Sequence, residues 1–67
     1  MKLIINGKEE TVIDGLNVSE LLKEKNVEMP EMVSVELNGE ILNRDAFQTT
    51  FLNQNDQVEF LYFMGGG

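Results

Sequence analysis

The 67-residue sequence predicts an α+β fold, in which one main helix packs on one face of a mixed sheet of four or five short strands. Two Asn-Gly pairs, at residues 6–7 and 38–39, each separate two apolar runs, and this is the strongest short signal for a β-hairpin. A stretch with helical spacing of apolar residues lies between the two pairs, and a long apolar run comes near the end. A chain of this length forms one domain with a thin core.

The charge balance and the missing residue types narrow the function. Twelve acidic and five basic residues give a net charge of −7. This balance argues against nucleic acid or an anionic membrane as a partner and suits a protein with a basic docking surface. There is no cysteine and no histidine, so the usual soft metal ligands and the commonest general base are absent. We therefore predict a protein that is not an enzyme and binds no metal or cofactor.

The sequence also predicts a cytoplasmic location. Its N-terminus lacks the charged and then apolar pattern of a signal peptide, and no stretch is long enough to span a bilayer. Without cysteine, the chain cannot be one of the disulfide-stapled small proteins that are typical of secretion.

The first hairpin is predicted from strands at residues 2–5 and 8–13, joined by the first Asn-Gly pair. Leu3 and Ile5 would face one side of the sheet and Ile4 the other. The second strand is mixed in character, so either Val12 or Ile13 could point inward.

Residues 16–26 are predicted to form the helix. Asn17 is a good N-cap, and Glu20 stands at the spacing of a capping box. Asn26 is the expected stop. The buried stripe would consist of the apolar residues at helical spacing, Val18, Leu21 and Leu22.

The later strands follow from alternation and turns. Residues 33–38 alternate strictly, with Val33, Val35 and Leu37 inward, and a short strand at 40–42 follows the second Asn-Gly pair. Residues 43–57 are irregular, with three apolar anchors into the core: Phe47, Phe51 and Leu52. The last strand covers residues 58–64. Because connections avoid crossing and crossovers are right-handed, this strand should lie beside the first, parallel to it and in the middle of the sheet. That arrangement is the β-grasp, or ubiquitin-like, fold.

The last strand carries a candidate partner-binding surface. Val58 and Phe60 continue the inward set, whereas alternate residues fall on the open face of the sheet. The predicted surface consists of Ile4, Leu61, Tyr62, Phe63 and Met64. An exposed apolar patch of this kind marks a protein-binding site. The alternative is that the run is apolar only because a central strand is covered on both faces.

Three glycines, Gly65, Gly66 and Gly67, follow this strand. We predict that residues 64–67 form a flexible tail, and glycine lets such a tail thread a narrow channel because it has no Cβ. Four residues reach about 13 Å when extended. The carboxylate of Gly67 could then be activated as an acyl-adenylate in the site of another protein. The alternative is an idle frayed end.

The sequence closely resembles the ThiS family of small sulfur carriers. The stretch "INGKEETVIDGLNVSELL" is similar to the family's opening hairpin and helix, "VSVELNGEIL" to its middle hairpin, and "VEFLYFMGGG" to its last strand and diglycine end. Arg44 matches a recurrent arginine. Two features depart from the family pattern: "NQND" replaces an Asp-Gly-Asp-like turn, and Asn43 and Phe47 stand where the family often has Pro and Trp.

The resemblance implies a sulfur carrier for thiazole formation in thiamine biosynthesis. A ThiF-like adenylyltransferase would consume ATP to adenylate Gly67, a persulfide sulfur donor would convert it to a thiocarboxylate, and a ThiG-like thiazole synthase would take the sulfur. The carrier would bind no cofactor itself. Two alternatives stay open: a carrier for molybdopterin, cysteine or thiolated tRNA, and a ubiquitin-like interaction module with an inert tail.

Overall fold

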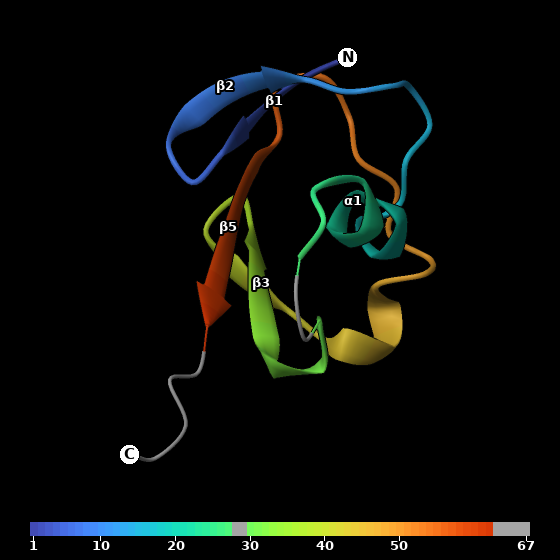
Figure 1. The fold of residues 1–67 in the computed structure, drawn as a ribbon, viewed down its shortest axis with the longest axis vertical. Coiled ribbons are helices and arrows are strands. Elements are labelled where there is room, and N and C mark those ends of the chain that lie inside the picture. Colours follow the sequence, from blue (N-terminus) through green and yellow to red (C-terminus); the bar gives the residue numbers. More distant parts are fainter. Residues whose placement is uncertain (28–29, 63–67) are drawn as a thin grey trace.

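The computed structural model of this chain describes residues 1–27 and 30–62, which form a mixed sheet with one α-helix on one face (Figure 1). The strands are β1 Lys2–Ile5, β2 Lys8–Thr11, β3 Val33–Leu37, β4 Glu40–Leu42 and β5 Gln57–Tyr62. The helices are α1 Val18–Glu24 and two 3₁₀ turns, η1 Pro30–Met32 and η2 Arg44–Ala46. Within the described residues the sheet has five strands in the order β2-β1-β5-β3-β4, and β5 is parallel to β1. The predicted β-grasp arrangement is confirmed.

The two predicted hairpin turns are confirmed by their backbone angles. Asn6 and Gly7 have φ of 52° and 80°, and Asn38 and Gly39 have φ of 52° and 87°. Two successive positive φ angles give a turn whose twist matches that of the flanking strands. These conformations explain why the sequence has Asn followed by Gly at both places.

β2 is shorter than predicted, because regular pairing ends at Lys2↔Thr11. Beyond it, Val12 is buried and Ile13 is 64% exposed, which settles the open question of their facing. Gly15, with φ of 84°, then turns the chain toward the helix.

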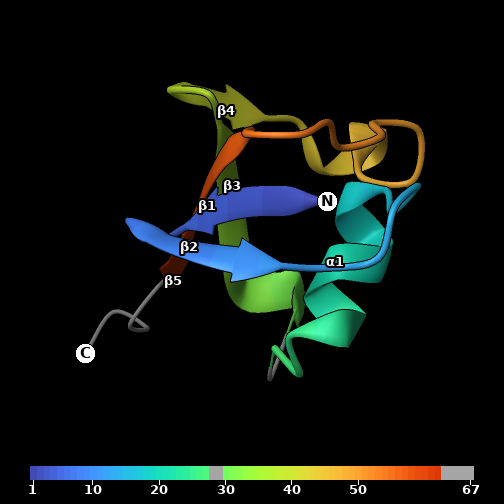
Figure 2. The ribbon, with the colours of Figure 1, turned by 90° about the horizontal axis from the view of Figure 1, so that it is seen from above.

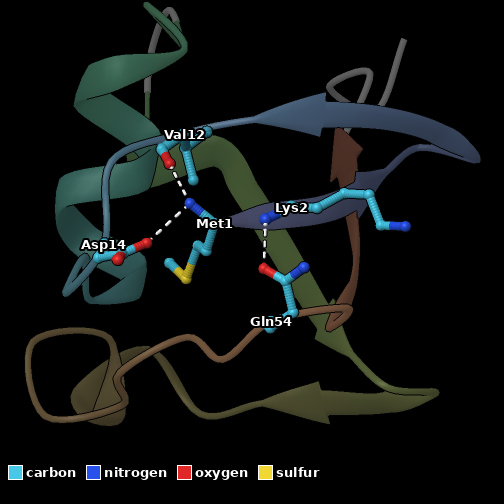
Figure 3. Close-up of polar contacts among 5 residues, drawn as sticks. All are labelled: Met1, Lys2, Val12, Asp14 and Gln54. Carbon is cyan, nitrogen blue, oxygen red and sulfur yellow. Dashed lines mark hydrogen bonds and ion pairs between the residues drawn. The ribbon is translucent and has the colours of Figure 1, made fainter.

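Polar contacts of the first two residues hold the start of β1 (Figure 3). The terminal ammonium of Met1 donates a hydrogen bond to the Val12 carbonyl at 2.6 Å and pairs with the Asp14 carboxylate at 2.7 Å. The Lys2 amide donates to the Gln54 side-chain carbonyl at 2.7 Å. This edge of the fold therefore joins β1 both to the loop before α1 and to the loop before β5.

The predicted helix caps are confirmed. The Glu20 amide donates to Asn17 Oδ1 at 2.7 Å, and the Asn17 amide donates to Glu20 Oε1 at 3.0 Å, so the capping box is complete. At the other end, Asn26 has φ of 53°, the left-handed conformation that ends many helices. An ion pair between Lys25 and Glu10 joins this end of α1 to β2.

The core lies between α1 and one face of the sheet, and the other face is open (Figure 2). Its buried apolar residues are Leu3, Ile5, Val12, Leu16, Val18, Leu21, Leu22, Val33, Val35, Phe47, Leu52 and Val58. Leu37 is partly buried against this cluster, so the predicted inward set of β3 is confirmed.

One predicted core anchor is wrong. Phe51 is 58% exposed, although Leu52 beside it is buried. Here the chain is extended and pairs with the segment before α1: the Leu52 amide donates to the Leu16 carbonyl, and Asn17 lies opposite Phe51. Successive side chains of an extended segment point to opposite sides. Leu52 therefore enters the core, and Phe51 faces away from it.

Candidate partner-binding surface

β5 carries the candidate site at its C-terminal end. Its inward residues Val58 and Phe60 behave as predicted: Val58 is fully buried, and Phe60 is partly buried against the core. Leu61 and Tyr62 are 41% and 51% exposed. The strand therefore passes from a buried segment to an exposed apolar one within four residues.

The pairing register shows which face each exposed side chain occupies. Leu61 lies opposite Ser34 and shares the facing of Glu59, on the open side of the sheet. Tyr62 lies opposite Val33 and so shares the facing of the inward set. It is 51% exposed nonetheless, at the last position of β5.

Ile4 does not join Leu61 in one continuous apolar patch. Both face the open side, but Ile4 lies opposite Gln57, four residues before Leu61. At about 3.3 Å per residue, the two positions are about 13 Å apart along the strand direction. Glu59 stands between them on the same face. The structure thus leaves Leu61 and Tyr62 next to each other in the chain at the end of β5, on opposite faces of the sheet, and Ile4 apart from both.

Three of the four charged side chains that the strands place on the open face are acidic, and the fourth, Lys2, lies 3.9 Å from Glu9. Glu36 and Glu59 are directly paired across β3 and β5, and Glu9 lies opposite Ile4. Ile41, which is 64% exposed, lies opposite Glu36 on the same face. Ile41 is absent from the predicted surface, although the alternation of β3, continued across the Asn-Gly turn, gives its outward facing.

Arg44 fixes the segment that pairs with the end of β5. Its guanidinium donates to the carbonyls of Pro30 at 2.9 Å and Val33 at 2.7 Å, and it lies 5.4 Å from the centre of the Phe47 ring. Val33 is the cross-strand partner of Tyr62. The arginine therefore holds β3 where β3 supports the exposed end of β5.

The remaining predicted site residues, Phe63, Met64, Gly65, Gly66 and Gly67, lie outside the described residues. Within the described part, no group of three or more acidic side chains is arranged to hold a metal ion. None of the described helices is long and apolar enough to cross a membrane.

The comparisons with known proteins agree with this architecture. The profile of the ThiS family matches residues 3–67. A crystal structure of the thiamine biosynthesis protein ThiS from Geobacter metallireducens is 55% identical and superposes with a TM-score of 0.90 over 100% of both chains. Two proteins named thiazole synthase, from Paramagnetospirillum magneticum and Magnetococcus marinus, are 37% and 33% identical over all 67 residues. The chain spans only 20% of the length of each of these relatives. With its profile matched almost from end to end, the chain belongs to the ThiS family, the small sulfur carriers of thiamine biosynthesis.

Proposed function

We propose that this chain carries sulfur to thiazole synthase as a thiocarboxylate on Gly67. The observation that carries the proposal is that two proteins named thiazole synthase include a segment similar to the whole chain. A carrier joined in one polypeptide to its acceptor has a high effective concentration at the acceptor site. A separate chain of the same family would serve the same acceptor by docking.

The chemistry proceeds at the carboxyl group of Gly67. A carboxylate oxygen attacks the α-phosphorus of ATP in a ThiF-like adenylyltransferase, and pyrophosphate leaves. The terminal sulfur of a persulfide donor displaces AMP and gives an acyl disulfide, which a second thiol cleaves to leave the thiocarboxylate. Transfer of the sulfur to the thiazole precursor, followed by hydrolysis, returns the carboxylate. ATP is consumed as a substrate of the partner enzyme, and the carrier holds no cofactor.

Two parts of the chain have separate functions, one as the tail that is modified and one as the surface that binds partners. Residues 64–67 act as the tail, and Gly65 and Gly66 let it pass through a narrow opening because they lack side chains. The partner-binding surface is formed by Leu61, Tyr62, Phe63 and Met64 at the root of the tail, with Ile4 as a separate contact on the acidic open face. The sheet supports this division, because β5 is central and its last residues, Leu61 and Tyr62, are paired with β3.

The test is the intact mass of the protein after incubation with ATP, a ThiF-like adenylyltransferase and a persulfide donor. We expect a mass gain equal to the exchange of one oxygen for sulfur, located at Gly67 by fragmentation. An unchanged mass, with an adenylyltransferase that is competent on another carrier, would contradict the proposal and favour an interaction module.

Truncation provides the matched control. A variant that lacks Gly66 and Gly67 should gain no sulfur while its melting temperature stays near that of the full chain, since glycine has no side chain to bury.

Leu61→Asp should weaken docking more than it lowers stability, because the Leu61 side chain is already 41% exposed. Equal losses of docking and stability would mean that Leu61 acts as a core residue.

A further inference from the structure

The backbone groups of β5 point alternately to its two neighbours. The amide of Ile4 donates to the Asp56 carbonyl and that of Asn6 to the Val58 carbonyl, both at 2.9 Å. The backbone amides and carbonyls of the even-numbered residues therefore face β1. Those of the odd-numbered residues, such as Gln57, face β3.

Pairing with β1 stops halfway along β5. The register runs through Ile4↔Gln57 and Ile5↔Val58, and the chain then enters the turn at Asn6. In a continued parallel ladder, the next bond would join the Phe60 amide to the backbone carbonyl of Asn6. The Phe60 amide instead donates to the side-chain oxygen of Asn6 at 2.9 Å. The Asn6 side chain thus completes the last bond on this side.

Beyond Asn6, β5 has an open edge. By the same alternation, the carbonyl of Phe60 and the amide of Tyr62 face away from β3, where no other described strand lies. Figure 1 shows this half of β5 with β3 on one side and no strand on the other. β3 still pairs with it fully, through Ser34↔Leu61 and Val33↔Tyr62.

Within the described residues, this short edge carries none of the side chains that protect other sheet edges. Proteins block longer exposed strand edges with charged residues, proline or bulges. The outer strand β2 follows that rule, because three of its four residues, Lys8, Glu9 and Glu10, are charged. The open half of β5 instead presents the exposed apolar side chains of Leu61 and Tyr62, one toward each face of the sheet.

We propose that thiazole synthase docks by laying an extended segment of its own backbone along this open edge of β5, bonded to the Phe60 carbonyl and the Tyr62 amide. This inference rests on the proposed function, because the thiazole synthase relatives supply the identity of the partner. Added strands gain affinity from main-chain hydrogen bonds and specificity from flanking side chains. Here Leu61 and Tyr62 flank the added segment on opposite faces. The position also suits delivery, because a single residue of the sequence separates Tyr62 from residues 64–67, which are proposed to enter the acceptor site.

The experiment compares two substitutions of one residue. Tyr62→Pro removes the amide hydrogen and the side chain, whereas Tyr62→Ala removes the side chain alone. Because the Tyr62 amide faces the open edge, proline there breaks no bond of the sheet. Affinity for thiazole synthase from the same genome is measured by titration calorimetry, and amide exchange of Tyr62 is followed by NMR in free and bound wild-type carrier.

We expect Tyr62→Pro to bind at least tenfold more weakly than Tyr62→Ala, with both variants folded, and the Tyr62 amide to exchange at least tenfold more slowly in the complex. Equal affinities of the two variants, with unchanged exchange at Tyr62, would overturn the edge-pairing proposal. Unfolding of Tyr62→Pro would also overturn it, because the amide would then be bonded within the chain. Failure of the proposed function gives a different pattern, in which the wild-type carrier does not bind thiazole synthase.

Discussion

The two Asn-Gly turns have the same dipeptide and nearly the same backbone angles, but they act at different points of β5. Asn38 holds its beginning: the Asn38 amide donates to the Gln57 carbonyl at 2.7 Å, and the Gln57 amide donates to Asn38 Oδ1 at 2.9 Å. Asn38 Nδ2 also donates to Asp56 at 3.1 Å. Asn6 acts later, through the amide of Phe60.

The difference shows that the local sequence determines the conformation of each turn. The part of β5 that lies beside the turn determines which hydrogen bonds the asparagine side chain makes. Both asparagines adopt positive φ because a two-residue hairpin requires it. Their side chains then meet whatever part of β5 lies nearby. At Asn38 this contact starts the strand, and at Asn6 it ends the pairing with β1 and leaves the edge beyond Phe60 open.

The largest loss of stability is expected from substitutions of the turn glycines, and it should be the same in both turns. Gly7→Val and Gly39→Val should each destabilise the fold by about 2 kcal/mol, because a β-branched residue is strained at positive φ. A Cβ at either glycine would meet nothing within 4 Å, so the backbone alone sets the effect. Urea unfolding of both variants measures it. Clearly unequal losses would show that the turns differ in their own geometry.

A smaller effect should separate the turns. Asn38→Gly and Asn6→Gly keep positive φ and remove only the side chains. Asn38 loses two side-chain hydrogen bonds and Asn6 loses one, so we expect a loss of about 1.5 kcal/mol for Asn38→Gly and about half that for Asn6→Gly. Amide exchange locates each loss. Gln57 should exchange faster in the first variant and Phe60 in the second, and the reverse pattern would contradict the division of roles.

Replacing each turn asparagine with aspartate should also affect the two turns differently. Asn6→Asp keeps the acceptor for the Phe60 amide and should change stability by less than about 0.5 kcal/mol. Asn38→Asp also keeps an acceptor, but it loses the bond to Asp56 and sets two carboxylates side by side, so we expect a loss of about 1 kcal/mol. Added salt should reduce that loss by screening the repulsion. A loss independent of salt would mean that the missing hydrogen bond alone is responsible.

Much of the fold could be predicted because it depends on signals that are local in sequence. The two turns, the capping box at Asn17 and the alternation of β3 each specify their own element. Their order then specifies the sheet, since few unknotted, right-handed connections are compatible with it. Asn55, in the turn "NQND", has φ of 72°, so asparagine adopts there the left-handed conformation that glycine often supplies.

The candidate site could be predicted only in part, because it depends on register and length. The apolar side chain of Phe51 predicts a position in the core, but an extended pairing with the segment before α1 turns it outward. The alternation of side chains predicts that Ile4 and Leu61 share a face, but only the β1–β5 register shows that they are four residues apart along the strands. The open edge at Phe60 requires knowing where β1 stops, which no local pattern near β5 encodes.

The smallest effect is expected at the two other asparagines with positive φ, Asn26 and Asn55. None of the side-chain hydrogen bonds among the described residues involves either asparagine. We therefore expect Asn26→Gly and Asn55→Gly to change stability by no more than about 0.5 kcal/mol, and Asn26→Gly to be neutral or slightly stabilising, since glycine is preferred after a helix. Thermal and urea unfolding beside Asn38→Gly measure this. Asn26→Gly could instead lower the free energy of unfolding as much as Asn38→Gly does. In that case the stability of the turns would come from the intrinsic preference of asparagine for positive φ, and not from the bonds of Asn38 and Asn6 to β5.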